Sequence, residues 1–410
     1  MLAQQERSLT AKQAVMVAKS FLAEKGFSLQ VRSIGRELET IRVEIFDLKG
    51  ISSVGSGKGI GEQALASALF EAIEHYVYTS IGGNGTSVPQ KLLLHGSDHL
   101  LNKISPSFCS ISGDQSLAFT RTKMREFLGK RSIFYPSFLL NPYFHPNLPK
   151  ELSDIRKYRL SRYSTNSGTA AGTSFSEALL HGVLEVVERD AIGLLFLGGV
   201  FKQKPQPIRK LNKPTLPDET QNLLNEIERE TGGKTSLIDI TTDLKVPATL
   251  AHICVERGKF KGNYFGSGAS LSAEYSFERA ALEALQTFHI YSFGMVKRPP
   301  VWTLDKDNIP LLFRCHLEAG IFFPRANYTK VNFDKTPVSD LCKSDVSGQL
   351  KGLTKMLDHL GYPVFYKTLS DGPIWVVRCE VLGLEKFHLV SHGIPVLPNA
   401  RGDQFLNTNH

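Results

Sequence analysis

A run of small residues followed by an acid-bearing helix occurs three times in this 410-residue chain, and it constrains the fold more than any other feature. The copies read "GSGKGIGEQALASALFEAIEH" from residue 55, "GTAAGTSFSEALLHGVLEVVER" from residue 168 and "GSGASLSAEYSFERAALEALQ" from residue 266. Each predicts a small-residue turn that leads into a helix with a pair of acidic or amide side chains. The copies begin about a hundred residues apart, which is too far for the stacked units of a solenoid. We expect three turn–helix units that meet at one site.

The segments around these units predict an α+β fold. Apolar periodicity predicts helices, and alternating or β-branched stretches predict strands. Expected strands lie at 41–48, 132–140, 236–241, 248–255 and 373–382, and expected helices at 62–79, 175–194, 216–230, 274–290 and 348–360. Because the two kinds interleave, we expect a mixed β-sheet with helices packed on it. Two proline-rich stretches, 140–158 and 293–310, are expected to be surface connections.

The N-terminal region, 1–45, predicts an amphipathic helix and a strand packed on a main domain, 46–410. Charged side chains from Glu6 to Lys19 interrupt its apolar run, unlike a signal peptide. No apolar run reaches the length of about 20 residues that a membrane span needs. We therefore expect a cytoplasmic protein without a membrane partner. The cysteines lack metal-type spacing and fit reduced thiols; they are Cys109, Cys254, Cys315, Cys342 and Cys379.

The net charge of +8 and the pI near 9.1 permit an anionic partner. The densest basic stretch, 201–213, contains Pro205 and Pro207 and no interleaved aromatic residues. Such a stretch is typical of a linker rather than of a nucleic-acid-binding face. Nucleic acid is therefore not the expected partner.

The first copy resembles a nucleotide-binding P-loop only superficially. A P-loop needs a glycine five positions before its Gly-Lys pair and a Ser or Thr after the lysine, whereas this chain has Ser52 and Gly59 there. The stretch "GGKTS" from residue 232 has Glu228 in the first-glycine position. What remains is a glycine-rich approach to a helix N-terminus, where backbone amides and Lys58 suit an anion.

The acidic residues of the helices carry a stronger signal. Ser67, Glu71 and Glu74 share one helix face by their spacing. The second helix aligns Glu177, His181, Glu185 and Glu188 beside Arg189, yet it is otherwise so apolar that we expect it to be buried on nearly all sides.

Buried carboxylates repel one another unless a cation neutralises them. Two interpretations follow: a divalent metal that bridges carboxylates to substrate phosphates, with Arg189 and Arg279 available to those phosphates, or a structural network of ion pairs.

In this order and over about residues 40–400, the three motifs resemble the YcaO-domain family. The resemblance implies a YcaO-type fold that binds ATP and Mg²⁺ without a P-loop and phosphorylates backbone amide oxygens of a peptide. It implies that Glu71, Glu74, Glu185 and Glu188 hold magnesium and the triphosphate, that Arg189 binds phosphate and that Gln286 contacts the nucleotide. The full implied nucleotide set is Lys58, Ser67, Glu71, Glu74, Glu177, Glu185, Glu188, Arg189, Glu283 and Gln286; no catalytic residue is assigned.

The chain departs from the family pattern at His75, where arginine is usual, and at Thr173, where asparagine is frequent. The resemblance implies cyclodehydration of Cys, Ser or Thr to azolines in a ribosomally made peptide. The proline-rich tail of azoline formers is reduced here to Pro395 and Pro398, which leaves thioamide formation with external sulfide, or a non-catalytic scaffold, as alternatives. Expected partners are a precursor peptide and a separate peptide-recognition or TfuA-type protein, with a homodimer left open. The tripeptide "RGD" from residue 401 has no expected role.

Overall fold

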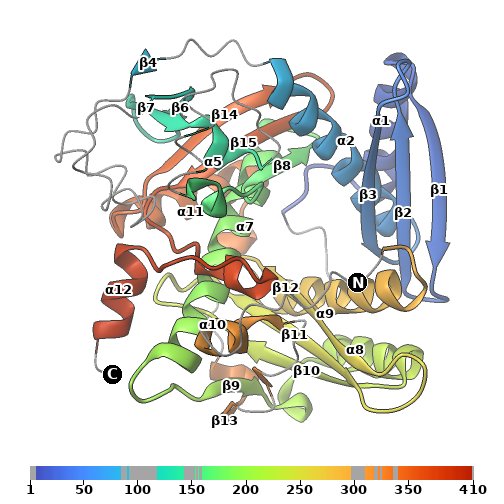
Figure 1. Ribbon diagram of the computed structural model, residues 1–410. Coiled ribbons are helices and arrows are strands. Elements are labelled where there is room, and N and C mark those ends of the chain that lie inside the picture. The colour runs from blue at the N-terminus through green and yellow to red at the C-terminus, as the bar shows by residue number, and fades with distance from the viewer. Residues whose placement is uncertain are drawn as a thin grey trace.

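A computed structural model of the protein describes residues 6–84, 90–91, 118–142, 153, 156, 159–296, 310–317, 322–323, 326–335 and 340–408. Over these residues, strands form one three-stranded, two five-stranded and one two-stranded sheet, with helices packed between and around them (Figure 1). The expected α+β class is thereby confirmed. Cys109 and most of the two expected surface connections lie outside the described residues.

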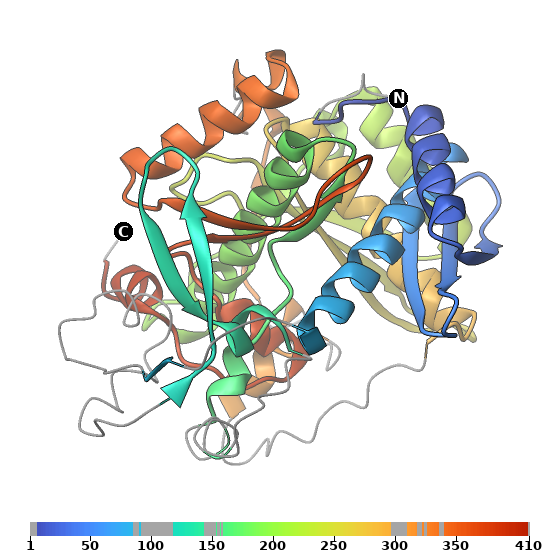
Figure 2. The same cartoon turned by 90° about the horizontal axis from the view of Figure 1, so that it is seen from above.

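The N-terminal part of the chain is an antiparallel sheet, in the order β1-β2-β3, with two helices packed on it (Figures 1 and 2). Its elements are α1 (Ala11–Glu24), β1 (Ser28–Ile34), β2 (Glu39–Phe46), β3 (Ser52–Gly59) and α2 (Glu62–Asn84). Alternate residues of β2, including Ile41 and Val43, join Ala68 of α2 in one buried cluster, as the period of a strand requires. The expected helix over 62–79 is confirmed and runs on to Asn84.

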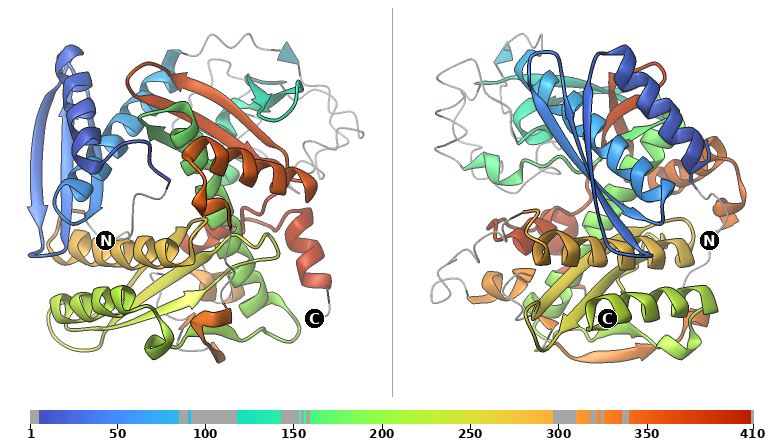
Figure 3. Two further views of the ribbon diagram at one scale, coloured as in Figure 1. Left: turned by 180° about the vertical axis from the view of Figure 1, so that it is seen from behind. Right: turned by 90° about the vertical axis from the view of Figure 1, so that its right-hand side faces the viewer.

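A second sheet, in the order β12-β11-β10-β9-β13, packs against helices α8 and α9 (Figure 3). The strands are β9 (Ile208–Leu211), β10 (Lys234–Asp239), β11 (Ala248–Val255), β12 (Gly262–Ala269) and β13 (Tyr328–Val331), and the helices are α8 (Asp218–Thr231) and α9 (Ala273–Ser292). Only β13 runs parallel to its neighbour in this sheet. The strands and helices expected in this region are confirmed to within two residues at each end.

The third sheet, in the order β7-β6-β14-β15-β8, packs against α7 and α11. Its elements are β6 (Arg121–Glu126), β7 (Ser132–Pro136), β8 (Thr169–Gly172), α7 (Phe175–Phe196), α11 (Val346–His359), β14 (Val364–Ser370) and β15 (Trp375–Val381). Smaller elements are β4 (Gln90–Lys91), β5 (Ala118–Phe119), α5 (Ser137–Leu140), η1 (Leu160–Tyr163), η2 (Leu197–Phe201), η3 (Lys213–Thr215), α10 (Pro310–Cys315), η6 (Phe333–Lys335), η7 (Asp340–Lys343), η8 (Phe387–His392) and α12 (Ala400–Asn407).

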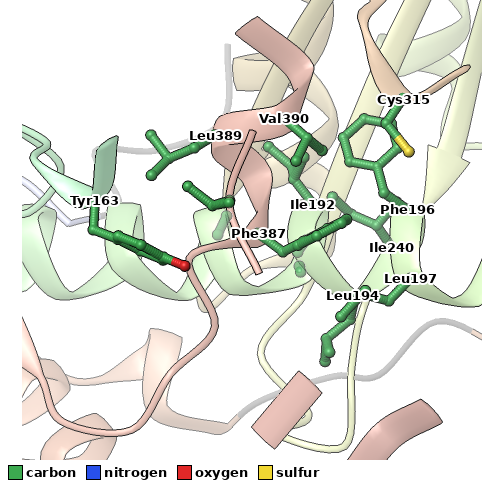
Figure 4. Close-up of a cluster of buried hydrophobic side chains, with 14 of the residues drawn as sticks. Tyr163, Ile192, Leu194, Phe196, Leu197, Ile240, Cys315, Phe387, Leu389 and Val390 are labelled. Atoms are coloured by element: carbon green, nitrogen blue, oxygen red, sulfur yellow. The ribbon is translucent and has the colours of Figure 1, made fainter. Parts of the chain in front are cut away.

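Helix α7 is the central element, and it is buried on nearly all sides as its sequence predicts. Its first half packs with β15 and α11. Its second half joins the largest hydrophobic cluster, where Ile192 and Phe196 lie beside Phe387 and Val390 of η8 (Figure 4). No helix among the described residues is both long and apolar enough to span a bilayer. The central position of α7 means that any charged side chain on it faces either a partner or a cavity.

The expected small-residue turns are wrong for most of these glycines, because the structure places them in strands. A Cβ atom on Gly55 of β3 would lie 2.2 Å from the carbonyl oxygen of Ala68, and one on Gly57 would lie 1.9 Å from that of Ala64. On Gly266 of β12 it would lie 2.1 Å from a backbone nitrogen of α9. Glycine is needed because the helix packs directly onto the strand, so the repeated unit is a strand followed by a helix.

The expected strand over 132–140 is only half correct, since β7 ends at Pro136 and α5 follows. All four residues of α5 are buried, and its apolar ones belong to the largest cluster. Periodicity cannot distinguish a short, wholly apolar strand from a buried helical turn, which is why the sequence misled here.

The C-terminal helix α12 is fixed to α7 by Arg401, the first residue of "RGD". Arg401 Nε donates to Asp190 Oδ1 at 2.7 Å and Nη2 to Asp243 Oδ1 at 2.6 Å, while Nη1 bonds to the Tyr362 hydroxyl at 2.8 Å. Asp190 is completely buried and directly follows Arg189 in the sequence. This arginine is therefore a structural anchor that holds α12 to α7.

Candidate functional site

Strand β3 and helices α2, α7 and α9 line a cavity of about 920 Å³. The structure brings together in it all the side chains for which a nucleotide role was expected: Lys58, Ser67, Glu71, Glu74, Glu177, Glu185, Glu188, Arg189, Glu283 and Gln286. A second cavity, of about 860 Å³, lies beside α12 and contains none of them. Two ion pairs lie in it, Arg209 with Asp239 at 3.2 Å and Arg401 with Asp243 at 2.6 Å. The first cavity is therefore the candidate site.

At one end of the cavity, three carboxylates from two helices lie close enough together for their negative charges to repel one another. Burial, and then the charges of Glu185 and Glu71, raise the pKa of Glu74 well above its usual range. Burial also raises the pKa of Glu71, although His75 and the Ser56 N–H act against it. The pKa of Glu185 is raised by burial too, with Arg189 opposing. Carboxylates held in this way favour a bound cation.

The donor set suits magnesium that is shared with phosphates. Among the described residues, no three Asp, Glu, His or Cys side chains converge closely enough to enclose a metal by themselves. Mg²⁺ seldom needs such a cage, because it keeps waters and binds one or two carboxylates together with substrate phosphates. Glu71, Glu74 and Glu185 therefore fit a metal that arrives with a phosphate chain.

Glu188 and Arg189 form the most extensively paired part of the site. Glu188 is almost fully buried and accepts from the Ser267 hydroxyl at 2.6 Å and from the Ala269 N–H at 3.1 Å. Arg189 lies 3.1 Å from Glu188 and 3.4 Å from Glu185. Burial alone would lower the pKa of Arg189, but these two carboxylates reverse the effect and raise it. Sequence reasoning missed Ser267, although its position between the glycines of the third copy could have indicated it.

Lys58 and Glu283 join the first and third units across the cavity. They form an ion pair, and Gln286 Nε2 donates to the Ser56 carbonyl of the same strand. Burial would raise the pKa of Glu283, but Lys58 and then Arg189 lower it. The expected lysine thus holds a carboxylate in this structure, and its charge is partly neutralised.

The two departures from the family pattern have local roles. Thr173 donates to Glu177 Oε2 from its N–H at 3.2 Å and from its hydroxyl at 2.6 Å. His75 Nδ1 lies 2.8 Å from the Val54 carbonyl and so ties α2 to β3. Both residues therefore help to position their helices. Ser67 of α2, a further residue expected at the site, lines the cavity.

A short N-terminal segment closes one end of the cavity, which the sequence did not indicate. Glu6 is buried and accepts from the Ser270 hydroxyl at 2.6 Å and the Leu271 N–H at 2.9 Å. The next residue, Arg7, lines the cavity and lies 3.5 Å from Glu177. Neither residue belongs to a repeated motif, so only the fold could reveal this contribution.

Comparison with known proteins agrees with this arrangement. A family model described as YcaO cyclodehydratase, ATP- and Mg²⁺-binding, matches residues 56–385. A Rhizobium leguminosarum bv. trifolii protein, "Uncharacterized protein in tfuA 3'region", is 28% identical over 203 residues, 49% of this chain. That match spans only 45% of the relative. An uncharacterized protein of Methanothermobacter thermautotrophicus is 27% identical over 358 residues, covering 82% of this chain and 83% of the relative.

Solved structures share the fold. The structure of YcaO from Methanopyrus kandleri bound with AMPPCP and Mg²⁺ has a TM-score of 0.65 at 17% identity and covers 97% of each chain. A heterocyclase in complex with substrate and cofactor has a TM-score of 0.67 at 19% identity, over 94% of this chain and 54% of that one. At 17% and 19% sequence identity, these matches show that the strands and helices are arranged alike.

Proposed function

This chain belongs to the YcaO family, and from that premise we propose that it uses Mg-ATP to activate a backbone amide of a peptide. One observation carries the proposal: three strand–helix units from distant parts of the sequence gather their acidic residues and Arg189 around a single cavity. Because three of these carboxylates have raised pKa values, the cavity favours a cation and the anion that accompanies it.

In this proposal Glu71, Glu74, Glu185 and Glu188 hold magnesium. The bound metal would neutralise and orient the triphosphate. Arg189 presents a planar pair of donors that suits a phosphate. Gln286 of α9 and Lys58 of β3 also line the cavity and would contact the nucleotide.

The reaction balances with ATP as the second substrate. A Cys, Ser or Thr side chain of the peptide adds to the preceding carbonyl, and the resulting oxyanion takes the γ-phosphoryl group of ATP and releases ADP. Phosphate then leaves with the former carbonyl oxygen, the amide nitrogen loses its proton, and an azoline ring remains. No side chain of this chain is assigned to the proton transfers.

Thioamide formation is the second candidate, and the relative from the tfuA 3' region favours it. In that reaction external sulfide, instead of a substrate side chain, adds to the amide, and sulfur replaces the oxygen that leaves in phosphate. A TfuA-type protein would be the partner in this case, and a peptide-recognition protein in the azoline case. A reducing, cytoplasmic setting suits both, and the free thiols of Cys254, Cys315, Cys342 and Cys379 support it.

The decisive experiment follows the amide oxygen. A candidate precursor peptide labelled with ¹⁸O at its backbone carbonyls is incubated with the chain, Mg-ATP and a candidate partner, with and without sulfide. Label in the released phosphate supports amide activation. The mass of the peptide then separates loss of water, for an azoline, from exchange of oxygen for sulfur.

Matched variants locate the reaction. Glu188→Gln should abolish label transfer. Glu228→Gln should keep it, because Glu228 lies on α8 outside the cavity, where it forms a 2.8 Å ion pair with Lys213 of η3. Tight peptide binding without ATP consumption with every partner would indicate a scaffold instead. Absence of Mg-ATP binding in calorimetry would reject the proposed function.

A further inference from the structure

The short helix η8 carries two histidines close to Arg189. Together with the second half of α7, this helix contributes to the largest hydrophobic cluster (Figure 4). Gly193 lies one turn after Arg189 on the same face of α7, and a Cβ atom on Gly193 would lie 3.2 Å from the backbone nitrogen of His388. His392 ends the same short helix. Since the charge of Arg189 acts on both imidazoles, they lie on the η8 side of a guanidinium that also lines the candidate cavity.

These imidazoles have hydrogen-bonding capacity that the described part of the protein does not use. His388 is only 4% exposed, and its buried Nδ1 has no hydrogen-bond partner. The same is true of Nδ1 of His316, which directly follows α10 and lies within electrostatic range of His392. A buried polar atom without a partner is costly to a fold and calls for a water, a ligand or a catalytic role to explain it. A ligand with complementary groups would satisfy these atoms.

Both histidines of η8 are neutral at neutral pH. Burial, and then the charge of Arg189, lower the pKa of His388 well below its usual range. His392 is exposed, yet the surrounding protein and the charge of Arg189 lower its pKa to about 4. A neutral imidazole has one N–H donor and one acceptor nitrogen, and these match the C=O and N–H of a peptide group. A phosphate oxygen, in contrast, could use only the donor.

Contacts of neighbouring residues fix η8 in place. Glu385 Oε1 accepts from the N–H of Lys386 at 2.8 Å and from that of Phe387 at 3.0 Å, at the start of the helix. Lys386 Nζ lies 2.6 Å from the buried carboxylate of Glu380. The two imidazoles are therefore presented by a helix that does not need their hydrogen bonds.

We propose that His388 and His392 bind the peptide substrate, with His388 at the amide that is activated and His392 nearer the surface. The inference rests on the proposed function, in which Arg189 binds phosphate, because the amide oxygen must come close to the γ-phosphate of ATP. It adds to that function the side of Arg189 on which the peptide lies, namely the side of η8.

A small peptide amide is a suitable probe of this contact. N-acetyl-glycyl-cysteine methylamide is titrated into the protein saturated with Mg-ADP, which prevents turnover, and NMR of ¹³C-labelled histidine rings follows each imidazole. We expect the signals of His388 and His392 to shift with one common dissociation constant. His388→Leu and His392→Gln should each weaken binding of the probe about fivefold, the scale of one hydrogen bond.

Thermal unfolding of His388→Leu separates a contact with the peptide from a structural role. Leucine removes an unpaired buried atom, so the melting temperature should stay at the wild-type value or rise. The matched control is His289→Leu, because His289 is also buried but its Nδ1 lies 2.9 Å from the Thr40 hydroxyl. This control should lower the melting temperature and leave binding of the probe unchanged.

A lower melting temperature of His388→Leu with wild-type affinity for the probe shows a structural role and overturns the inference. Imidazole signals that ignore the probe in the wild type, while Mg-ADP binds, overturn it as well. If His388→Leu does not fold, the exposed His392 decides: wild-type affinity in His392→Gln refutes the contact. A wild type that binds no Mg-ADP rejects the proposed function itself, which is a distinguishable result.

Discussion

Replacing Glu74 with glutamine should make the nucleotide-free protein more stable while it abolishes nucleotide binding. In the structure Glu74 accepts one backbone hydrogen bond, from Ala171. Burial and the charges of Glu185 and Glu71 disfavour its ionised form. Glutamine has nearly the same shape and can keep the bond to Ala171. Removing such an unfavourable buried charge commonly raises the free energy of unfolding by about 1 kcal/mol. For a chain of this size that corresponds to a rise of about 1–2 °C in the melting temperature.

The pH dependence of this effect has a definite sign. The folded-state pKa of Glu74 lies above its unfolded value, so the carboxyl stabilises the fold while protonated and loses this contribution as pH rises through the folded pKa. The advantage of Glu74→Gln should therefore be small in acid and grow as pH rises. Thermal unfolding without nucleotide, recorded across the pH range, measures it.

Glu188→Gln is the matched contrast and should behave in the opposite way. Glu188 accepts from Ser267 and Ala269 and pairs with Arg189 at 3.1 Å, so its charge is well compensated. Loss of these charge-assisted contacts should cost about 2–3 kcal/mol of unfolding free energy. If Glu74→Gln instead destabilises the protein at every pH, the carboxylates form a structural ion-pair network and our interpretation of a cation site is wrong.

Three further outcomes follow from the same contacts. Gly57→Ala should destabilise the fold by about 1–3 kcal/mol, because its Cβ would meet the Ala64 carbonyl at 1.9 Å; urea unfolding measures this, and an unchanged midpoint would contradict the close packing. Arg401→Met should cost about 3–5 kcal/mol by leaving buried Asp190 unpaired, and Asp190→Asn in the same chain should recover part of the loss in thermal unfolding. Removal of Mg²⁺ with a chelator should abolish ATP binding in calorimetry; full affinity without metal would exclude the proposed role of the carboxylates.

The sequence predicted which side chains meet in one cavity better than it predicted the local structure around them. Helical spacing alone placed Glu71 with Glu74 and Glu185 with Glu188, because a helix face is fixed by its period. It could not show that Gly55 and Gly57 belong to a strand, since glycine is common both in turns and where a helix packs closely on a strand.

Contacts between distant segments were beyond sequence reasoning. Ser267 meets Glu188, and Glu6 meets Ser270, only because the sheets and helices bring these segments together. Arg401 looked like part of a chance tripeptide, yet it bridges Asp190 and Asp243. In each case a single polar residue has a role that its neighbours in the sequence do not indicate.

The contacts at the cavity also join the three units in pairs. The backbone of Ala171 in the second unit donates to Glu74 of the first. Lys58 of the first unit pairs with Glu283 of the third, and Glu188 of the second accepts from Ser267 of the third. No unit alone supplies all the side chains that line the cavity, so the cavity exists only when all three are folded together. Mg-ATP, if it binds as proposed, therefore stabilises the whole assembly, and saturating nucleotide should delay unfolding of all three units in one transition.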